Sequence, residues 1–468
     1  MIILGKFVYL KKRITFIERI FDMLTIYSSA GNAKRLEFVS NHLFNEVLGT
    51  EFQIVADSAF YRQQTGTCIN YSAEPLDHGL QIFPQGLLSE SNIHPIQNLQ
   101  IAQWNNLFCF FHNERGDIPF DLFAATFYLL SLYEEYFPTS LDEHGRFDPQ
   151  NSLLFQNACL EIPIIDRWAY QLKETLENSG YSTAEFRLRK YRAISTYDID
   201  FPFLYRYKGL IKSAGALLRD CLKQDFEAVK ERLSVLLRRS EDPYMQAIRF
   251  IHSTEMQAER SYYLFVLLGK RGKLGRSAVY SPKDYYRYLK ELSAVSIGLH
   301  PSYETYKSYK THKTYQTLIS EKNSLEKILQ HPIAFSRQHF LRMLTPDTFQ
   351  ALLQAGIRED FTLAFANAPG FRSGTAVPHF FYDLQKEEAT SLLLRPTVMM
   401  DSSLIINLKL SPEAALDKIK SLIDACKESG GDYLSLWHNS NIAGSPEKNP
   451  WIRVFIESHR YATFTEND

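Results

Sequence analysis

From about residue 190 onward, short apolar runs alternate with longer segments of helical periodicity. The apolar runs cover residues 191–197, 261–269, 294–300 and 433–439. Runs of this length between turn residues are typical of buried strands, and strands that alternate with helices form βα units around a parallel sheet or barrel. Because active sites in such folds lie where strands end and loops begin, the polar residues that follow these runs are the candidates for chemistry.

The 468 residues are too many for one compact core, so we expect more than one domain. The onset of this alternation near residue 190 predicts a smaller α/β domain over 1–188 and a barrel-like α/β domain over 189–468. Within the first domain, residues 119–137 are apolar on nearly every face and predict a buried helix. Residues 163–180 predict an amphipathic helix with Asp166 as its N-cap.

The charges are balanced, with 52 Lys and Arg against 53 Asp and Glu, so no global field attracts nucleic acid or an anionic membrane. Any site for a polyanion has to be local. At the N-terminus, Lys6, Lys11, Lys12 and Arg13 interrupt the apolar segment, which argues against a signal sequence or a membrane span. The residues before Met23 read as an amphipathic helix or a non-native extension.

The five cysteines are scattered along the chain, and none forms a C-x-x-C pair. This spacing argues against a disulfide framework or a thiolate metal site and fits a reducing compartment. We therefore expect a cytoplasmic protein. The sequence carries no signal for its oligomeric state.

Polar side chains that could carry chemistry follow the apolar runs. They are Asp198 and Asp200, His300 (two residues after Gly298, which would permit a tight strand end), Arg337 with His339, His438, and Arg372 between two glycines that could turn it inward. Residues two apart in an extended chain share a face, so Asp198 and Asp200 should point the same way. Two like charges so close require a metal ion, a shared proton or a flanking cation. Carboxylates, imidazoles and a guanidinium at successive strand ends are what a metal-assisted hydrolase needs.

The order of several short motifs resembles a known family. The segments "STYDID", "YYLFVLLG", "IGLHPSY", "SRQHFLR", "GFRSGT" and "LSLWHNS" resemble the polysaccharide deacetylases (NodB-homology, carbohydrate esterase family four). They look most like a divergent bacterial branch with an extra N-terminal domain. The resemblance covers about residues 190–445, and "INYSAEPLD" and "PFDLFAATFYLLSLYEEY" look like that N-terminal domain.

The resemblance implies a distorted (β/α) barrel and metal-dependent removal of an acetyl group from a sugar, by amide or ester hydrolysis. It implies a divalent metal, zinc in the first place with Co, Mn or Ni as alternatives, and a carbohydrate substrate. Matched position by position, Asp198 is the base and Asp200 a metal ligand. His300 matches the first His of the metal motif, His438 the late acid, and Arg337 an arginine that orients the base.

One position departs from the family pattern. Glu304 stands where the family has its second metal-binding His. Glu304 could supply an oxygen ligand, His339 could complete the site from the next strand, or the site could be too weak to hold metal. The last case predicts a protein that binds carbohydrate without hydrolysing it.

Two further classes of enzyme use a D-x-D motif after an apolar strand. In haloacid-dehalogenase phosphatases the first Asp is a nucleophile, but those enzymes usually have Thr or Val where this chain has Pro202. A nucleotide-sugar glycosyltransferase would leave His300 and His438 unexplained. The Gly- and Lys-rich stretch 269–277 is expected to be a basic solvent-facing loop, and the Tyr- and Lys-rich stretch 302–316 a solvated helix face.

Overall fold

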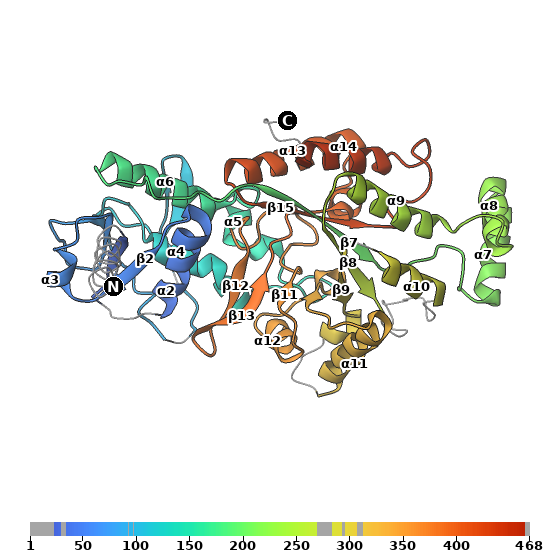
Figure 1. Ribbon diagram of the computed structural model, residues 1–468, viewed down its shortest axis with the longest axis horizontal. Helices are drawn as coiled ribbons and strands as arrows, with labels where there is room; N and C mark the ends of the chain where they lie inside the picture. Colours follow the sequence, from blue (N-terminus) through green and yellow to red (C-terminus); the bar gives the residue numbers. More distant parts are fainter. Residues whose placement is uncertain are drawn as a thin grey trace, which may run out of the picture.

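The computed structural model describes residues 23–29, 34–91, 93–96, 98–268, 283–292, 295–306 and 312–463. The expected basic loop at 269–277 and the segment before Met23 lie outside the described residues, as does 307–311 within the Tyr- and Lys-rich stretch. The described chain forms a smaller N-terminal α/β region and a larger α/β region, drawn at the left and at the centre and right of Figure 1.

The N-terminal region is built on a parallel sheet of order β2-β1-β3-β4 and a separate antiparallel pair, β5 and β6. The strands are β1 (Leu24–Tyr27), β2 (Phe52–Val55), β3 (Cys68–Tyr71), β4 (Leu80–Ile82), β5 (Ile101–Trp104) and β6 (Leu107–Phe110). The helices are α2 (Lys34–Ser40), the π-helix η1 (Asn41–Leu48), α3 (Ser58–Tyr61), α4 (Leu122–Leu130), the 3₁₀ helices η2 (Tyr133–Tyr136) and η3 (Pro149–Asn151), α5 (Leu153–Gln156) and α6 (Ile164–Asn178).

Both helices expected in this region are present, with one correction to each. Every residue of α4 is buried, but the helix is shorter than 119–137 because Leu132 adopts a left-handed φ of 55° before η2. Helix α6 follows the expected range, yet Asp166 is not its N-cap. Asp166 lies in the first turn and accepts hydrogen bonds from Thr375 Oγ1 at 2.5 Å and Ala376 N at 2.9 Å, so its carboxylate joins the two regions.

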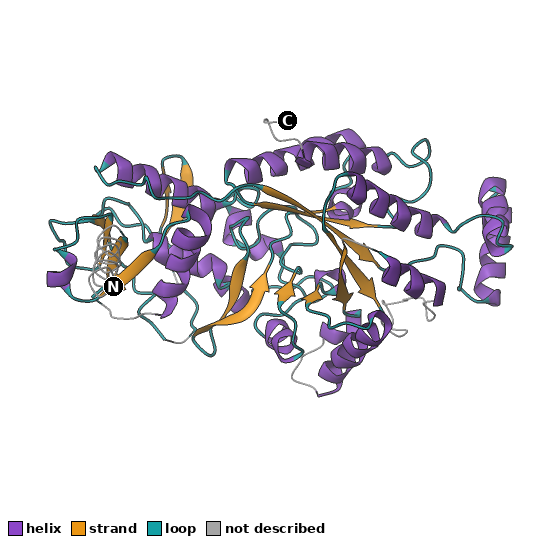
Figure 2. Cartoon of the chain, in the orientation of Figure 1, coloured by secondary structure: helices purple, strands orange, loops and turns teal. Residues whose placement is uncertain are grey.

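The second region is a curled sheet of nine strands in the order β12-β13-β11-β10-β9-β8-β7-β15-β14. All neighbours are parallel except β12 and β13, and Figure 2 shows the strands curling into an incomplete barrel with helices outside. The strands are β7 (Arg192–Ile199), β8 (Tyr262–Leu267), β9 (Val295–His300), β10 (Phe335–Ser336), β11 (Glu359–Asp360), β12 (His379–Asp383), β13 (Glu388–Leu394), β14 (Met399–Met400) and β15 (Asp432–His438).

Helices connect these strands. They are α7 (Leu210–Leu222), α8 (Phe226–Leu236), α9 (Pro243–Gln257), α10 (Lys283–Glu291), the 3₁₀ helix η4 (Tyr303–Tyr306), α11 (His312–Leu329), the 3₁₀ helix η5 (His339–Leu341), α12 (Asp347–Gln354), the π-helix η6 (Ser403–Asn407), α13 (Pro412–Glu428) and α14 (Trp451–Thr463). Most of them lie outside the sheet, whereas α7 and α8 stand away from it (Figure 1). The expected α/β architecture, a distorted barrel preceded by a smaller α/β region, is confirmed.

The four apolar runs are the neighbouring strands β9, β8, β7 and β15, so their carboxyl ends share one edge of the sheet. Gly298 does not end its strand as expected but lies inside β9. A Cβ at this position would come within 2.6 Å of the Phe265 ring, so the glycine allows two adjacent strands to pack closely.

The two regions share apolar packing. Phe365, Val377 and Tyr382, from the segment between β11 and β13, belong to the core of the N-terminal region. The boundary at residue 188 stays a prediction. All five cysteines are free, as the spacing predicts, and no helix in the described part of the chain has the length and apolar character needed to cross a bilayer.

Candidate metal and catalytic site

The predicted site residues converge at the carboxyl edge of the parallel sheet. Asp198 is directly opposite His438 in the register of β7 and β15. His300 is the last residue of β9, and Arg337 follows β10. Parallel strands deliver their last residues to the same edge, which is why positions far apart in sequence meet here.

Asp200, His300 and His339 form a group whose ligand atoms all lie within 4.8 Å of one another. Asp200 Oδ1 is 3.2 Å from His300 Nε2 and 3.6 Å from His339 Nε2. Burial alone raises the pKa of Asp200, but the two imidazoles beside it hold that pKa well below its usual range. A carboxylate between two imidazoles is a ligand set that suits a divalent transition metal such as zinc.

Polar atoms at the centre of this group have no hydrogen-bond partner among the described residues. They are Asp200 Oδ1 and His300 Nε2, which face each other at 3.2 Å. His339 Nδ1, the ring nitrogen other than the one that faces Asp200, also has no partner among these residues. Leaving a buried polar atom unsatisfied costs about 1–3 kcal/mol, so such a group calls for a partner outside the chain. A cation coordinated by Asp200 Oδ1 and His300 Nε2 would remove this cost, and the residues present therefore fit a divalent ion.

The tautomer of His300 is fixed by its backbone contact. Its Nδ1–H donates to the carbonyl oxygen of Arg337 at 2.6 Å, so Nε2 is the ring nitrogen that faces the carboxylates. Metal-binding imidazoles are commonly oriented by such a bond from the other ring nitrogen.

Asp198 is held between a cation and an imidazole. Arg337, which is fully buried, donates Nη1–H to Asp198 Oδ1 at 3.0 Å, while Asp198 Oδ2 lies 3.7 Å from His300 Nε2. Arg337 is itself fixed by bonds to the Phe361 carbonyl at 3.0 Å and to Thr397 Oγ1 at 3.2 Å. Both aspartates of the D-x-D motif therefore face His300, as their spacing predicts, and a flanking cation neutralises one of them.

His438 is paired with Asp401, a residue that sequence reasoning missed. His438 Nδ1 lies 2.6 Å from Asp401 Oδ1, and the His438 backbone N–H donates to Asp401 Oδ2 at 2.7 Å. Burial lowers the pKa of His438, but Asp401, with smaller contributions from Asp200 and Asp198, raises it to about 10. Asp401 follows β14 and so lies at a strand end like the other candidates, but the apolar run before it covers only residues 398–400.

Two predicted residues lie apart from this group. Arg372 is buried and donates to Glu135 Oε1 at 2.7 Å and to the Ala364 carbonyl at 2.7 Å, so it links the barrel to the N-terminal region. Glu304 lies in η4 and does not belong to the group of ligand atoms found among the described residues. The catalytic role of Arg372 and the ligand role of Glu304 stay predictions.

The loop that carries His339 is braced by the N-terminal region. Phe340 has a left-handed φ of 62°, a costly conformation for a bulky residue. Arg146 donates to the Phe340 carbonyl at 2.7 Å, and Arg342 donates to the His144 carbonyl at 2.6 Å. These bonds connect the residues on either side of the turn to the segment 142–146 and so fix the position of His339.

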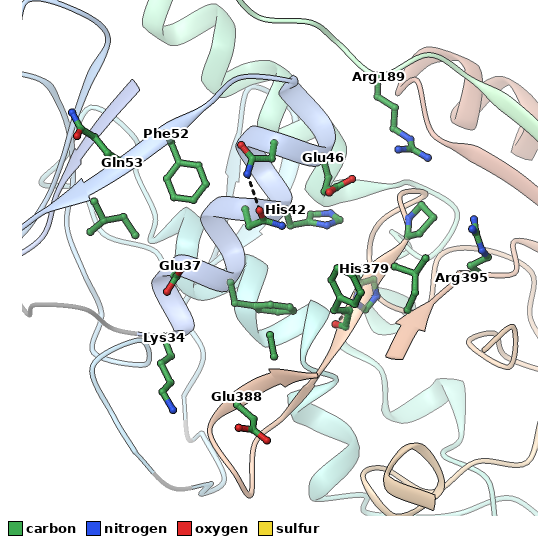
Figure 3. Close-up of a pocket in the computed structure, with 18 of the residues that line it drawn as sticks. Lys34, Glu37, His42, Glu46, Phe52, Gln53, Arg189, His379, Glu388 and Arg395 are labelled. Carbon is green, nitrogen blue, oxygen red and sulfur yellow. Dashed lines mark hydrogen bonds between the residues drawn. The ribbon is translucent and has the colours of Figure 1, made fainter. Parts of the chain in front are cut away.

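A large cavity of about 1160 Å³ lies elsewhere, between α2–η1 and β12. Figure 3 shows His42 and His379 in its middle and Arg189 and Arg395 to one side. Its wall includes Arg192, the first residue of β7, whereas Asp198 ends that strand. The cavity therefore opens at the amino edge of the sheet, away from the acids and imidazoles described above.

Comparisons with known proteins give three kinds of result. A family model described as "Family of unknown function (DUF7033)" matches residues 24–181. No curated protein matches the chain. Among solved structures, one described as a polysaccharide deacetylase from Mycobacterium smegmatis is 11% identical with a TM-score of 0.38, covering 59% of this chain and 84% of that one. An allantoinase is 8% identical with a TM-score of 0.38, covering 58% of this chain and 84% of that one. None of these matches shows what the present chain binds or catalyses.

Proposed function

We propose that this protein is a metal-dependent hydrolase that removes acetyl groups from a sugar or polysaccharide. The observation that carries the proposal is the convergence of ligand atoms from Asp200, His300 and His339 beside Asp198. An acid, a base and a ligand set for a cation thus meet at one edge of the sheet. These are the groups that metal-assisted hydrolysis needs.

Each residue has a role that its contacts support. A divalent ion held by Asp200, His300 and His339 would supply Lewis-acid polarisation of the substrate carbonyl and of a water molecule. Asp198, oriented by Arg337, accepts the proton of the attacking water. His438, which carries a proton because of Asp401, donates it to the departing nitrogen or oxygen.

The acetylated sugar as substrate rests on a different argument. It comes from the order of the sequence motifs that resemble polysaccharide deacetylases. An aromatic surface beside the metal group is compatible with it, because Phe340 is 37% exposed and its ring centroid lies 4.6 Å from that of His339. Apolar ring faces of this kind can pack against the C–H faces of a sugar.

The alternatives make different demands on the same residues. A carbohydrate-binding homologue without catalysis needs no base, yet Asp198 is held by a buried arginine and faces His300. A D-x-D phosphatase would use Asp198 as a nucleophile and form a phosphoryl-enzyme. Neither alternative has a use for the ion pair of His438 with Asp401.

The test is a pair of assays on protein loaded with zinc or cobalt. Acetate release from N- and O-acetylated sugars is expected, and phosphate release from phosphate esters is not. Phosphate trapped on Asp198 would contradict the proposal, as would full acetate release by the Asp198→Asn variant.

The pH dependence of activity should report the pairing of His438 with Asp401. Because His438 acts as an acid, activity should fall as the pH rises through its pKa. Asp401→Asn removes the carboxylate that raises this pKa, so the alkaline limb of the kcat profile should move to lower pH by roughly one to three units. The matched control is Ser402→Ala, which changes a neutral neighbour 3.4 Å from the same nitrogen. An unmoved alkaline limb in Asp401→Asn would show that His438 is not the acid.

A further inference from the structure

The connection between β7 and α9 contains a helical hairpin, α7 and α8, that presents large apolar side chains to solvent. Of the thirteen residues of α7, only Asp220 is buried. Figure 1 shows the hairpin at the right-hand end of the molecule, at a distance from the sheet. Its exposed apolar side chains, with their exposed fractions, are Leu210 91%, Ile211 90%, Leu218 62%, Leu222 76%, Phe226 70%, Leu233 40%, Leu236 38% and Leu237 60%.

These side chains form a continuous stripe. At 100° per residue, Leu210, Ala214, Leu218 and Leu222 fall on one face of α7, with Ile211 between them. An ordinary surface helix turns such a stripe toward the core. Here the stripe faces outward, and the two residues at its N-terminal end, Leu210 and Ile211, are nine-tenths exposed. An exposed apolar surface of this kind is typical of an interaction site.

The hairpin carries a net positive charge, although the chain as a whole is nearly neutral. Residues 206–239 contain nine Lys and Arg and four Asp and Glu, a net charge of +5 in a chain whose total is −1. The acids are engaged locally, since Asp220 accepts from Arg232 at 2.6 Å and Glu231 from Tyr205 at 2.7 Å. Glu227 pairs with Lys448. The uncompensated charge is therefore positive.

Cations border the apolar stripe on one side, and one of them, Arg219, also pairs with Asp220 at 3.3 Å. On α7, Lys212, Arg219 and Lys223 fall together on the side of the helix next to Ile211 and Leu222. An apolar stripe bordered by Lys and Arg is typical of helices that lie in the interface of an anionic bilayer, with acyl chains against the stripe and headgroup phosphates against the cations. The long Lys and Arg stems allow their charges to stay at the headgroup level.

We propose that the α7–α8 hairpin docks this protein on the surface of an anionic lipid membrane. A second copy of the chain could also cover the stripe, but two hairpins of charge +5 would repel one another. An anionic bilayer offers both an apolar phase and the opposite charge.

The position of the hairpin relates it to the candidate site. It leaves the sheet after Asp200, at the carboxyl edge. The carboxylate of Asp242 accepts hydrogen bonds from Leu204 N at 2.7 Å and Tyr205 N at 2.9 Å, which holds the two ends of the insertion together. The hairpin and the D-x-D motif therefore lie at the same edge of the sheet. Docking of the hairpin would bring this edge near the membrane surface. The proposal does not depend on the proposed hydrolase activity.

The test is flotation of the full chain with vesicles. Binding is expected to vesicles of phosphatidylglycerol and phosphatidylcholine in equal parts and to be at least tenfold weaker to phosphatidylcholine alone. High salt should weaken it, because the attraction is screened. Leu210→Ser with Ile211→Ser should lower the partition coefficient by at least about tenfold, and so should Lys212→Glu with Lys223→Glu. The matched control is Ile406→Ser with Leu408→Ser, at exposed apolar positions outside the hairpin.

Because Leu210 and Ile211 are exposed, replacing them with Ser should leave the thermal unfolding temperature unchanged. The variant with Lys212→Glu and Lys223→Glu tests the proposal independently. Failure of the wild-type chain to bind anionic vesicles would overturn the proposal. Equal binding to neutral vesicles, or unchanged binding by both hairpin variants, would also overturn it. Self-association in sedimentation velocity without lipid, lost in Leu210→Ser with Ile211→Ser, would assign the surface to a second copy instead. The Asp200→Ala variant should bind vesicles as the wild-type chain does, because membrane docking does not depend on the metal site.

Discussion

Asp200→Ala is expected to abolish stoichiometric binding of a divalent ion and, with it, hydrolysis. The carboxylate of Asp200 faces both imidazoles of the group, at 3.2 Å from His300 Nε2 and 3.6 Å from His339 Nε2. Without it, only two imidazoles are left, one fewer than the three protein ligands that catalytic zinc sites have. His300→Ala should have the same effect because it removes the Nε2 that faces both aspartates. Elemental analysis of purified, metal-loaded protein measures the loss directly.

The controls for this prediction separate the two candidates for the third ligand. His339→Ala should lose the metal, whereas Glu304→Ala should retain it, because Glu304 is not part of the group of converging ligand atoms. Cys221→Ser should also retain it, since the exposed Cys221 lies on α7. Stoichiometric zinc in Asp200→Ala would contradict the ligand set, and loss of zinc in Glu304→Ala with retention in His339→Ala would reassign the third ligand.

Asp198→Asn is expected to lower activity by roughly 10² to 10⁴ while the bound metal stays. The amide keeps the volume of the side chain but cannot accept the proton of the attacking water. Asp198 is 3.7 Å from His300 Nε2 and is held by Arg337 at 3.0 Å, which suits a base beside the metal better than a ligand. The measurement is kcat for acetate release together with metal content on the same sample.

Asp200→Asn is the matched comparison, because it changes the other carboxylate of the motif in the same way. It should lose metal first, and excess ion should restore part of its activity, since an amide oxygen is a weaker ligand than a carboxylate. If the two variants behaved alike in metal content and in recovery, the separate roles of the two aspartates would be wrong.

Much of the framework of the site could be predicted from the sequence. The strands β7, β8, β9 and β15 are long enough to appear as apolar runs, and the parallel arrangement of their neighbours follows from the helices between them. Asp198, Asp200, His300 and His438 can therefore be placed at one edge of the sheet from the sequence alone. The even spacing of the two aspartates was sufficient to put them on one face.

The parts that escaped prediction depend on contacts between distant segments. Asp401 was missed because the strand before it, β14, has only two residues and appears in the sequence as a very short apolar run. The approach of His339 to Asp200 could not be predicted, because His339 precedes a left-handed turn at Phe340 whose carbonyl is held by Arg146, a residue nearly two hundred positions away. Asp166 resembled a helix cap, but its partners Thr375 and Ala376 come from the other region.

The most direct test of the central claim is the anomalous diffraction of a crystal grown with zinc and measured at the zinc absorption edge. The geometry predicts one strong peak about 2 Å from Asp200 Oδ1, from His300 Nε2 and from a ring nitrogen of His339. Asp198 should lie beside the peak with its bond to Arg337 intact. Absence of a peak among Asp200, His300 and His339 would contradict the metal centre and the hydrolase mechanism built on it.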